Sequence, residues 1–160
     1  MNTNEQLITD LYSAFQKRDG AKMAGFYHAD AVFSDAVFGP LHGKEIGAMW
    51  QMLCLRGKDL KVGFSRVNAD NKSGSAHWQA WYTFSSTGRK VHNVIHATFI
   101  FKNGKILEHH DHFNFWRWSS QALGPLGVLL GWTPFVQSKV RAQAKNALIA
   151  FMQKKEGKSL

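Results

Sequence analysis

The feature that most constrains the fold is a run of four strand-like segments in the second half of the chain. They cover residues 60–69, 75–85, 91–101 and 105–116, and short stretches rich in Asn, Gly, Ser and Thr divide them. Such stretches favour turns. Residues 4–18, 21–27 and 44–55 have helical spacing of apolar side chains, and residues 31–35 form a short strand between them. Because helices and strands do not alternate, a doubly wound fold is excluded and the α+β class is predicted, with helices on one face of the sheet.

Composition favours one globular domain. The chain has 160 residues, of which 44% are hydrophobic and 19% charged. Cys54 is the only cysteine, so no intrachain disulfide can form. The first ten residues lack the pattern of a secretory signal, and we expect a cytoplasmic protein. The apolar stretch at residues 123–136 is interrupted by glycines and prolines, so we expect no integral membrane association.

The C-terminal part is basic. The formal net charge is +9, and the segment from Arg117 onward carries seven Lys and Arg residues against Glu156 alone. A solvated helix face is the favoured interpretation, ahead of an anionic surface and of nucleic acid, which we do not expect as a partner. Residues 134–152 have the pattern of a helix. This tail could close over a pocket, pack in a homodimer or rest on lipid, and packing on the same domain or on a twin subunit is favoured.

Two sequence motifs carry a resemblance to a known family. Residues 26–35, followed by Gly39 and the Gly-Lys-Glu-Ile run at 43–46, are similar to the entry strand and third helix of ketosteroid isomerases and SnoaL-like proteins. Residues 99–111 resemble the hairpin and the Gly-Lys-Ile-x-Glu-His-x-Asp pattern of SnoaL-like proteins. Together they resemble the SnoaL-like branch (polyketide cyclase / ketosteroid isomerase-like) of the nuclear-transport-factor-2-like (NTF2-like) superfamily over about residues 4–116.

The resemblance implies a cystatin-like cone. N-terminal helices would pack on a curved, mixed, mostly antiparallel sheet around an apolar pocket, within a domain spanning residues 1–118. Residues 119–160 would add a C-terminal helical extension. Function does not follow from the resemblance, because the superfamily includes isomerases, polyketide cyclases, epoxide hydrolases and binding domains.

The last strand carries the leading candidates for chemistry. Side chains alternate along a strand, so His109, Asp111 and Phe113 share one face, which the resemblance assigns to the pocket. A carboxyl group that loses its water titrates nearer neutral pH, where it can act as an acid or a base. Asp35 falls where ketosteroid isomerases carry their proton-shuttling aspartate. The expected catalytic residues are Asp111, His109 and Asp35, and the expected pocket residues are Trp50, Trp78, Tyr82, Asn93, His96 and Phe113.

Two activities of the superfamily are not expected. The resemblance places the oxyanion donors of ketosteroid isomerases on Leu11 and Ala97, which have no polar group to donate. It places two members of the limonene-epoxide-hydrolase triad on Ile95 and Ala97, which leaves only Asp111.

The position of His96 depends on the hairpin register. A two-residue turn at Asn103-Gly104 would set His96 opposite Asp111, as a histidine base oriented by a carboxylate. A three-residue loop with a glycine bulge would set Ile95 there and turn His96 to the other face. The three-residue loop is favoured because it agrees with the family resemblance.

The leading functional hypothesis is a cofactor-independent enzyme that performs acid/base chemistry on a small apolar or aromatic carbonyl compound. The alternative is a non-catalytic ligand-binding or dimeric interaction domain. The histidines of the last two strands lack a diagnostic ligand spacing, so no metal site is expected. A homodimer through the outer, histidine-rich face of the sheet is predicted.

Overall fold

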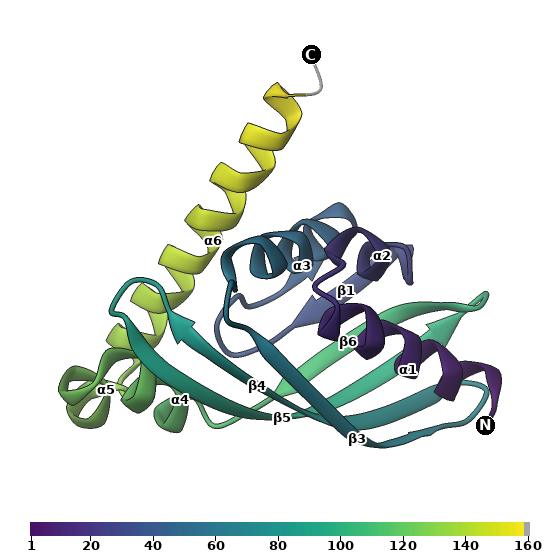
Figure 1. Ribbon diagram of the computed structural model, residues 1–160, viewed down its shortest axis with the longest axis horizontal. Helices are drawn as coiled ribbons and strands as arrows, with labels where there is room; N and C mark the ends of the chain where they lie inside the picture. The colour runs from purple at the N-terminus through teal and green to yellow at the C-terminus, as the bar shows by residue number, and fades with distance from the viewer. Residues whose placement is uncertain (159–160) are drawn as a thin grey trace.

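The fold is built on one six-stranded sheet (Figure 1), seen in a computed structural model that describes residues 1–158. The strand order is β2-β1-β6-β5-β4-β3. β1 (Tyr27–Ser34) runs parallel to β6 (Lys105–His112), and every other pair is antiparallel. The predicted mixed, mostly antiparallel sheet is therefore confirmed. The two-residue β2 (Leu41–His42) forms one edge.

Three N-terminal helices cover one face of the sheet. They are α1 (Thr3–Gln16), α2 (Gly20–Ala24) and α3 (Lys44–Arg56). α1 begins before the expected residue 4, because Asn2 and Glu5 form a capping box in which each side chain accepts a bond from the other's backbone N–H. The expected second helix is too long, since Tyr27 already belongs to β1.

The meander has the predicted order with shifted ends. β3 (Lys61–Ala69), β4 (Ser73–Phe84) and β5 (Arg89–Lys102) pair in sequence, and β5 then pairs with β6. Buried and exposed residues alternate along β5, where Ile95 and Ala97 are buried and Val94 and His96 are exposed. One face of the sheet therefore packs against the helices while the other faces outward.

The β5–β6 hairpin has neither of the two expected registers. Asn103 and Gly104 both have positive φ angles, of 52° and 73°, and form a two-residue turn between Lys102 and Lys105. The favoured three-residue loop is therefore wrong. A bulge follows, because Phe101 pairs with Ile106 whereas Ile100 pairs with Glu108. This single inserted residue sets Ala97, rather than His96 or Ile95, opposite Asp111.

The C-terminal region forms three helices: α4 (Phe115–Leu123), α5 (Pro125–Leu130) and α6 (Pro134–Gly157). The strand expected through Trp116 ends at His112, because the Asn114 side chain accepts a bond from Arg117 N and caps α4. α4 lies beside the first half of β5, where Gln121 bonds to the backbone N–H and C=O of His92. α6 packs against α3, and its C-terminal end projects beyond the body of the protein (Figure 1). The last two residues of the expected extension lie outside the described residues.

The main core lies between the helices and the inner face of the sheet. Its largest fully buried side chains include Trp50, Tyr12, Phe33 and Phe99. A second cluster joins Phe115 and Trp118 of α4 to the start of α6 and to Val91. Within residues 1–158, no helix has the length and apolar character needed to span a bilayer.

Candidate functional site

A cavity of about 260 Å³ lies between the inner face of the sheet and helices α3, α4 and α6. Most of its wall is apolar, with aromatic side chains contributed by β1, α3, β4 and α4. The polar groups that reach it include two carboxylates, Asp35 and Asp111, and the hydroxyl of Tyr82. A mostly apolar cavity with a few converging polar groups is the usual form of a small-molecule site.

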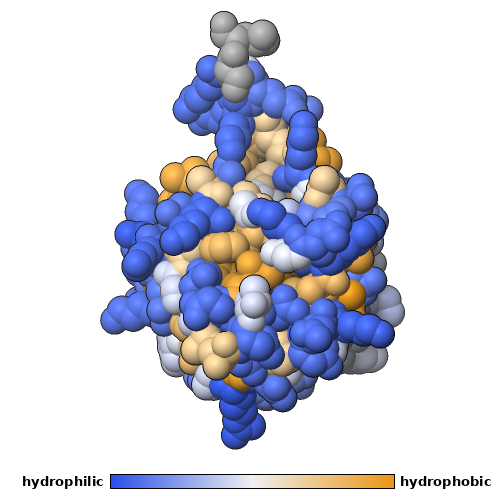
Figure 2. Space-filling model, turned by 90° about the vertical axis from the view of Figure 1, so that its right-hand side faces the viewer, coloured by the Kyte–Doolittle hydropathy of each residue, from blue (hydrophilic) through white to orange (hydrophobic). Residues whose placement is uncertain are grey.

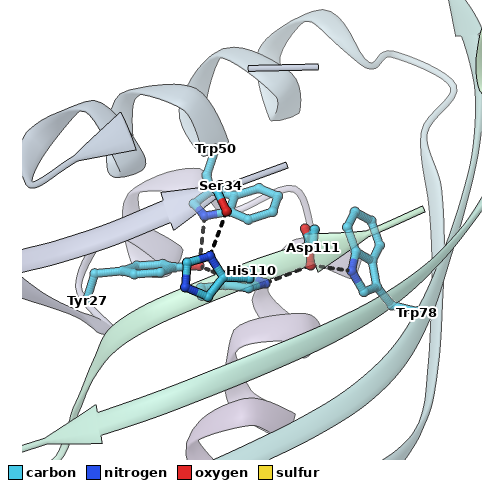
Figure 3. A network of polar contacts seen from close by, with 7 residues as sticks. Tyr27, Ser34, Trp50, Trp78, His110 and Asp111 are labelled. Atoms are coloured by element: carbon cyan, nitrogen blue, oxygen red, sulfur yellow. Dashed lines mark hydrogen bonds and ion pairs between the residues drawn. The ribbon is translucent and has the colours of Figure 1, made fainter. Parts of the chain in front are cut away.

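Asp111 reaches the cavity from β6 and is held in one orientation. The residue is only 5% exposed, and its inward direction follows from strand alternation and the bulge. Its Oδ1 accepts a bond from Trp78 Nε1 at 3.2 Å (Figure 3) and another from His109 Nε2 at 2.9 Å. Its Oδ2 has no hydrogen-bond partner among residues 1–158. This second oxygen is therefore available to a molecule in the cavity.

A buried row of hydrogen bonds supports Asp111 from behind (Figure 3). Trp50 Nε1 donates to the Tyr27 hydroxyl at 2.9 Å, and that hydroxyl lies 2.8 Å from His109 Nδ1. Since the Tyr27 oxygen already accepts from Trp50, its single proton is free to donate to Nδ1. His109 then carries its own proton on Nε2 and donates it to Asp111. With a neutral His109 in the Nε2–H tautomer, every donor in this row has an acceptor.

Asp35 follows β1 and lines the cavity near Asp111, since its neighbour Ser34 pairs with His110, the neighbour of Asp111. Its Oδ1 accepts the backbone N–H groups of Val37 and Phe38, at 2.9 and 2.6 Å, which closes a tight turn. Burial raises the pKa of Asp35 to about 7, with a further contribution from the negative charge of Asp111, while the two backbone N–H groups and Arg141 act in the lowering direction. Asp35 is therefore a group that exchanges protons near neutral pH.

Tyr82 contributes a hydroxyl from β4. Its oxygen accepts a bond from Trp118 Nε1 at 2.7 Å, and its own proton has no acceptor among the described residues. Burial raises the pKa of Tyr82 to about 12, and the nearby charge of Asp35 adds to this effect. The hydroxyl therefore remains protonated and can donate a hydrogen bond to an oxygen in the cavity.

The structure brings most of the expected residues together. Seven of them line the cavity: Asp35, Trp50, Trp78, Tyr82, Asn93, Asp111 and Phe113. His109 is fully buried behind Asp111 and does not line the cavity.

His96 is the expected pocket residue that the structure places elsewhere. The bulge in β6 and the alternation along β5 turn its side chain to the outer face, where it is exposed and pairs with His77 and His112 on the neighbouring strands. Its expected place in the pocket is therefore wrong. Within residues 1–158, no three His, Cys, Asp or Glu side chains are grouped so that they could hold a metal ion.

Sequence reasoning missed three contributors to the site. Tyr27 was assigned to the end of a helix, although its position in the Phe-Tyr-His-Ala-Asp run at the start of β1 could have placed it on the inner face. Trp118 is not among the expected pocket residues, yet it lines the cavity. α6 also lines it, through Val140, Gln143, Ala144 and Ala147. No sequence signal indicates which surface a C-terminal helix will cover.

A family model and several solved structures match this chain. The family model described as the SnoaL-like domain matches residues 8–109. A comparison with curated proteins found no match.

Several solved structures share the fold. One is a putative polyketide cyclase from Pseudomonas putida, with a TM-score of 0.63 and 18% identity, where the match covers 76% of this chain and 98% of that chain. Another is an LEH-like epoxide hydrolase from M. tuberculosis, with a TM-score of 0.61 and 15% identity over 80% and 95% of the two chains. A third is a hypothetical protein with a ketosteroid isomerase-like fold from Catenulispora acidiphila, in complex with trimethylamine, with a TM-score of 0.65 and 13% identity over 80% and 97%. At these identities the likeness shows the fold alone.

Proposed function

Because the chain belongs to the SnoaL-like domain family, we propose that its cavity is the active site of a cofactor-independent acid/base enzyme. The substrate class is a small apolar or aromatic carbonyl compound. The observation that carries the proposal is the Asp111 carboxylate at an apolar cavity: its Oδ1 is fixed by two hydrogen bonds, and its Oδ2 has no partner among residues 1–158. Aromatic walls suit an apolar substrate, and the polar groups suit its carbonyl group.

In this proposal Asp111 is the base. Its Oδ2 takes a proton from the carbon next to the substrate carbonyl, and the electron pair of that C–H bond moves onto the carbonyl oxygen as an enolate. The Tyr82 hydroxyl and the protonated form of Asp35 donate hydrogen bonds to the enolate oxygen. Asp111 then returns the proton to another atom of the same molecule, so no oxidant, reductant or cofactor is consumed.

Two further residues act through Asp111 and Tyr82: His109, which is buried behind the cavity wall, and Trp118, which lines the cavity. His109 orients Asp111, and Trp118 donates to Tyr82, which strengthens the hydroxyl as a donor. We regard both as positioning residues. Two structural neighbours, described as a putative polyketide cyclase and an LEH-like epoxide hydrolase, have names that refer to small-molecule chemistry, which is consistent with the proposal.

A crystal structure of the protein purified without added ligand tests the cavity directly. A carbonyl-containing or aromatic molecule in contact with Asp111 supports the proposal. A cavity closed by the side chains of Trp50, Trp78 and Phe113 in the crystal contradicts it. An occupied cavity whose ligand is not altered by the enzyme favours the alternative, a ligand-binding domain.

We also propose a homodimer through the outer face of the sheet. Trp81, Val94 and Ile100 are large apolar side chains exposed on this face, where Trp81 stacks on His92. No helix among residues 1–158 covers them. A second copy of the same face would bury this apolar surface.

A further inference from the structure

The end of the protein formed by α4, α5 and the start of α6 carries a concentrated apolar surface. We call it the apolar tip, and it lies at the lower left of Figure 1. Leu129, Trp132 and Phe135 are its most exposed members, at 69%, 66% and 73%. The face of the molecule seen in Figure 2, which lies away from the apolar tip, is mostly hydrophilic and has apolar areas among its polar side chains. The apolar tip consists of Trp116, Leu126, Val128, Leu129, Leu130, Trp132 and Phe135.

The polar groups of the apolar tip are bonded within the tip itself. Trp116 Nε1 donates to Val128 O at 3.1 Å, and Trp132 Nε1 donates to Leu129 O at 3.0 Å. Neither indole N–H therefore depends on water. The two ring systems can enter an apolar phase without losing a hydrogen bond, which is the requirement for burial in lipid.

The charged residues that flank the apolar tip in the sequence are all basic. Residues 118–138 contain no charged side chain, and no Asp or Glu occurs between Asp111 and Glu156. Arg117 and Lys139 border the stretch, and both are exposed. The Lys139 ammonium lies 5.9 Å from the centre of the Phe135 ring. The apolar tip thus combines exposed apolar rings with flanking cations, as membrane-surface segments do.

This charge pattern distinguishes between the possible occupants of the surface. If two copies met symmetrically through their apolar tips, each cation would approach cations of the other copy, and residues 112–155 supply no acidic side chain to compensate. An anionic bilayer offers both the apolar phase and the opposite charge. An anionic bilayer is therefore the occupant that fits both the exposed apolar rings and the flanking cations.

We propose that the apolar tip binds reversibly to an anionic membrane surface. Leu129, Trp132 and Phe135 enter the boundary between headgroups and acyl chains, while Arg117 and Lys139 contact the lipid phosphates. The chain would lie on the bilayer without crossing it. This inference goes beyond the proposed acid/base chemistry and does not depend on it.

Co-sedimentation with lipid vesicles tests the proposal. Vesicles of equal parts phosphatidylcholine and phosphatidylglycerol are compared with vesicles of phosphatidylcholine alone. The wild-type protein is expected to sediment with the anionic vesicles, and less so as salt is added. The double substitution Leu129→Ser and Phe135→Ser is expected to weaken this partition at least about 10-fold, because two apolar side chains no longer enter the lipid.

A matched control uses Leu55, which is 68% exposed at the end of α3, outside the apolar tip. Leu55→Ser is expected to bind the vesicles like the wild type, and thermal melting confirms that each variant is folded. The proposal is overturned if the wild type stays in the supernatant, or if the double variant binds as well as the wild type. It is also overturned if the double variant changes only the mass measured by light scattering, since the occupant would then be a second copy.

Discussion

His109 Nε2 donates to Asp111 Oδ1 over 2.9 Å, between two side chains of one strand that lie two residues apart. Both residues are buried, at 0% and 5% exposure. They form the last step of the row of hydrogen bonds that begins at Trp50 and ends at the cavity. The strand supplies both residues of the pair, so their relative position is set by β6 alone. What differs between them is access, because only Asp111 reaches the cavity.

The first prediction concerns Tyr27. Tyr27→Phe removes the acceptor of the Trp50 N–H and the donor to His109 Nδ1, and both partners are buried. Leaving them unpaired should lower the free energy of unfolding by about 1–3 kcal/mol in urea denaturation. Tyr12→Phe is the matched control, because the buried Tyr12 hydroxyl has no hydrogen-bond partner in the described part of the chain and its loss should cost little. Equal destabilisation by the two substitutions would show that the row of hydrogen bonds does not contribute to the free energy of unfolding. Nitrogen NMR of the wild type should find the His109 proton on Nε2.

The second prediction concerns the pH dependence of stability. The pKa of Asp35 is about 7 in the folded state, compared with an ordinary value of 3.8. Between these values the folded state binds more protons than the unfolded state, so this group makes stability fall as the pH rises from about 4 to about 7. The loss would be up to about 4 kcal/mol at 1.4 kcal/mol for each pH unit.

Asp35→Asn should remove this part of the slope while its amide oxygen keeps the bonds from Val37 and Phe38. Urea denaturation at several pH values checks it. The variant should be at least as stable as the wild type above neutral pH. Asp59→Asn, on an exposed carboxylate, should leave the slope in this window unchanged. A variant that is destabilised equally at every pH would mean that Asp35 only anchors the turn.

The third prediction links the two carboxylates of the cavity. The charge of Asp111 raises the pKa of Asp35, although burial is the larger cause. Asp111→Asn should therefore lower the pKa of Asp35 below about 7 and leave it above the ordinary 3.8. Carbon NMR of the Asp35 carboxyl group during a pH titration measures this shift. If the pKa of Asp35 is unchanged in this variant, the two carboxyl groups lie too far apart to act on one substrate.

The fourth prediction concerns the proposed dimer. Val94→Asp puts a charge on the outer face, at a side chain that is 41% exposed, and should give a monomer in light scattering at micromolar concentration. Ile149→Asp, at a 42% exposed position on α6, should leave the dimer intact. A wild-type monomer would refute the proposal.

Acid should weaken the same dimer. His77, His96 and His112 are neighbours across three strands. Burial and the two neighbouring histidines hold the pKa of His96 below its ordinary value of 6.5. Protonation of these histidines at acidic pH adds positive charges to both sides of the interface. The dimer should therefore dissociate as the pH falls. A dimer that is stable from neutral to acidic pH would show that these histidines do not lie in the interface.

Periodicity and turn chemistry were enough to predict most of the fold. The meander, its turns and the α+β class follow from local pattern, and the resemblance carried by residues 26–46 and 99–111 is confirmed by the family match over residues 8–109. Element ends were less accurate, because caps such as Asn114 decide them through single hydrogen bonds.

The site could be predicted only as far as side chains alternate regularly between the two faces of a strand, which we call strand parity. Parity placed Asp111, Tyr82 and Trp78 on one face, and the cavity has all three. The favoured register turned His96 to the outer face, where the structure has it, but a two-residue turn followed by a bulge produces this placement instead of the expected three-residue loop. The contributions of Trp118 and α6 depend on tertiary packing between segments distant in sequence, which local patterns do not encode.

The central claim is that Asp111 moves a proton of a carbonyl compound, and hydrogen–deuterium exchange tests it most directly. A panel of small cyclic and aromatic ketones in deuterated buffer is followed by proton NMR, with the wild type, Asp111→Asn and Asp35→Asn. The account predicts that the wild type exchanges protons next to the carbonyl of at least one ketone, and that Asp111→Asn loses this activity about 100-fold or more. Exchange should fall as the pH rises through about 7 in the wild type, where Asp35 loses its proton, and Asp35→Asn should lack that fall. A ketone that binds in the cavity and exchanges equally fast with the wild type and with Asp111→Asn would contradict the account.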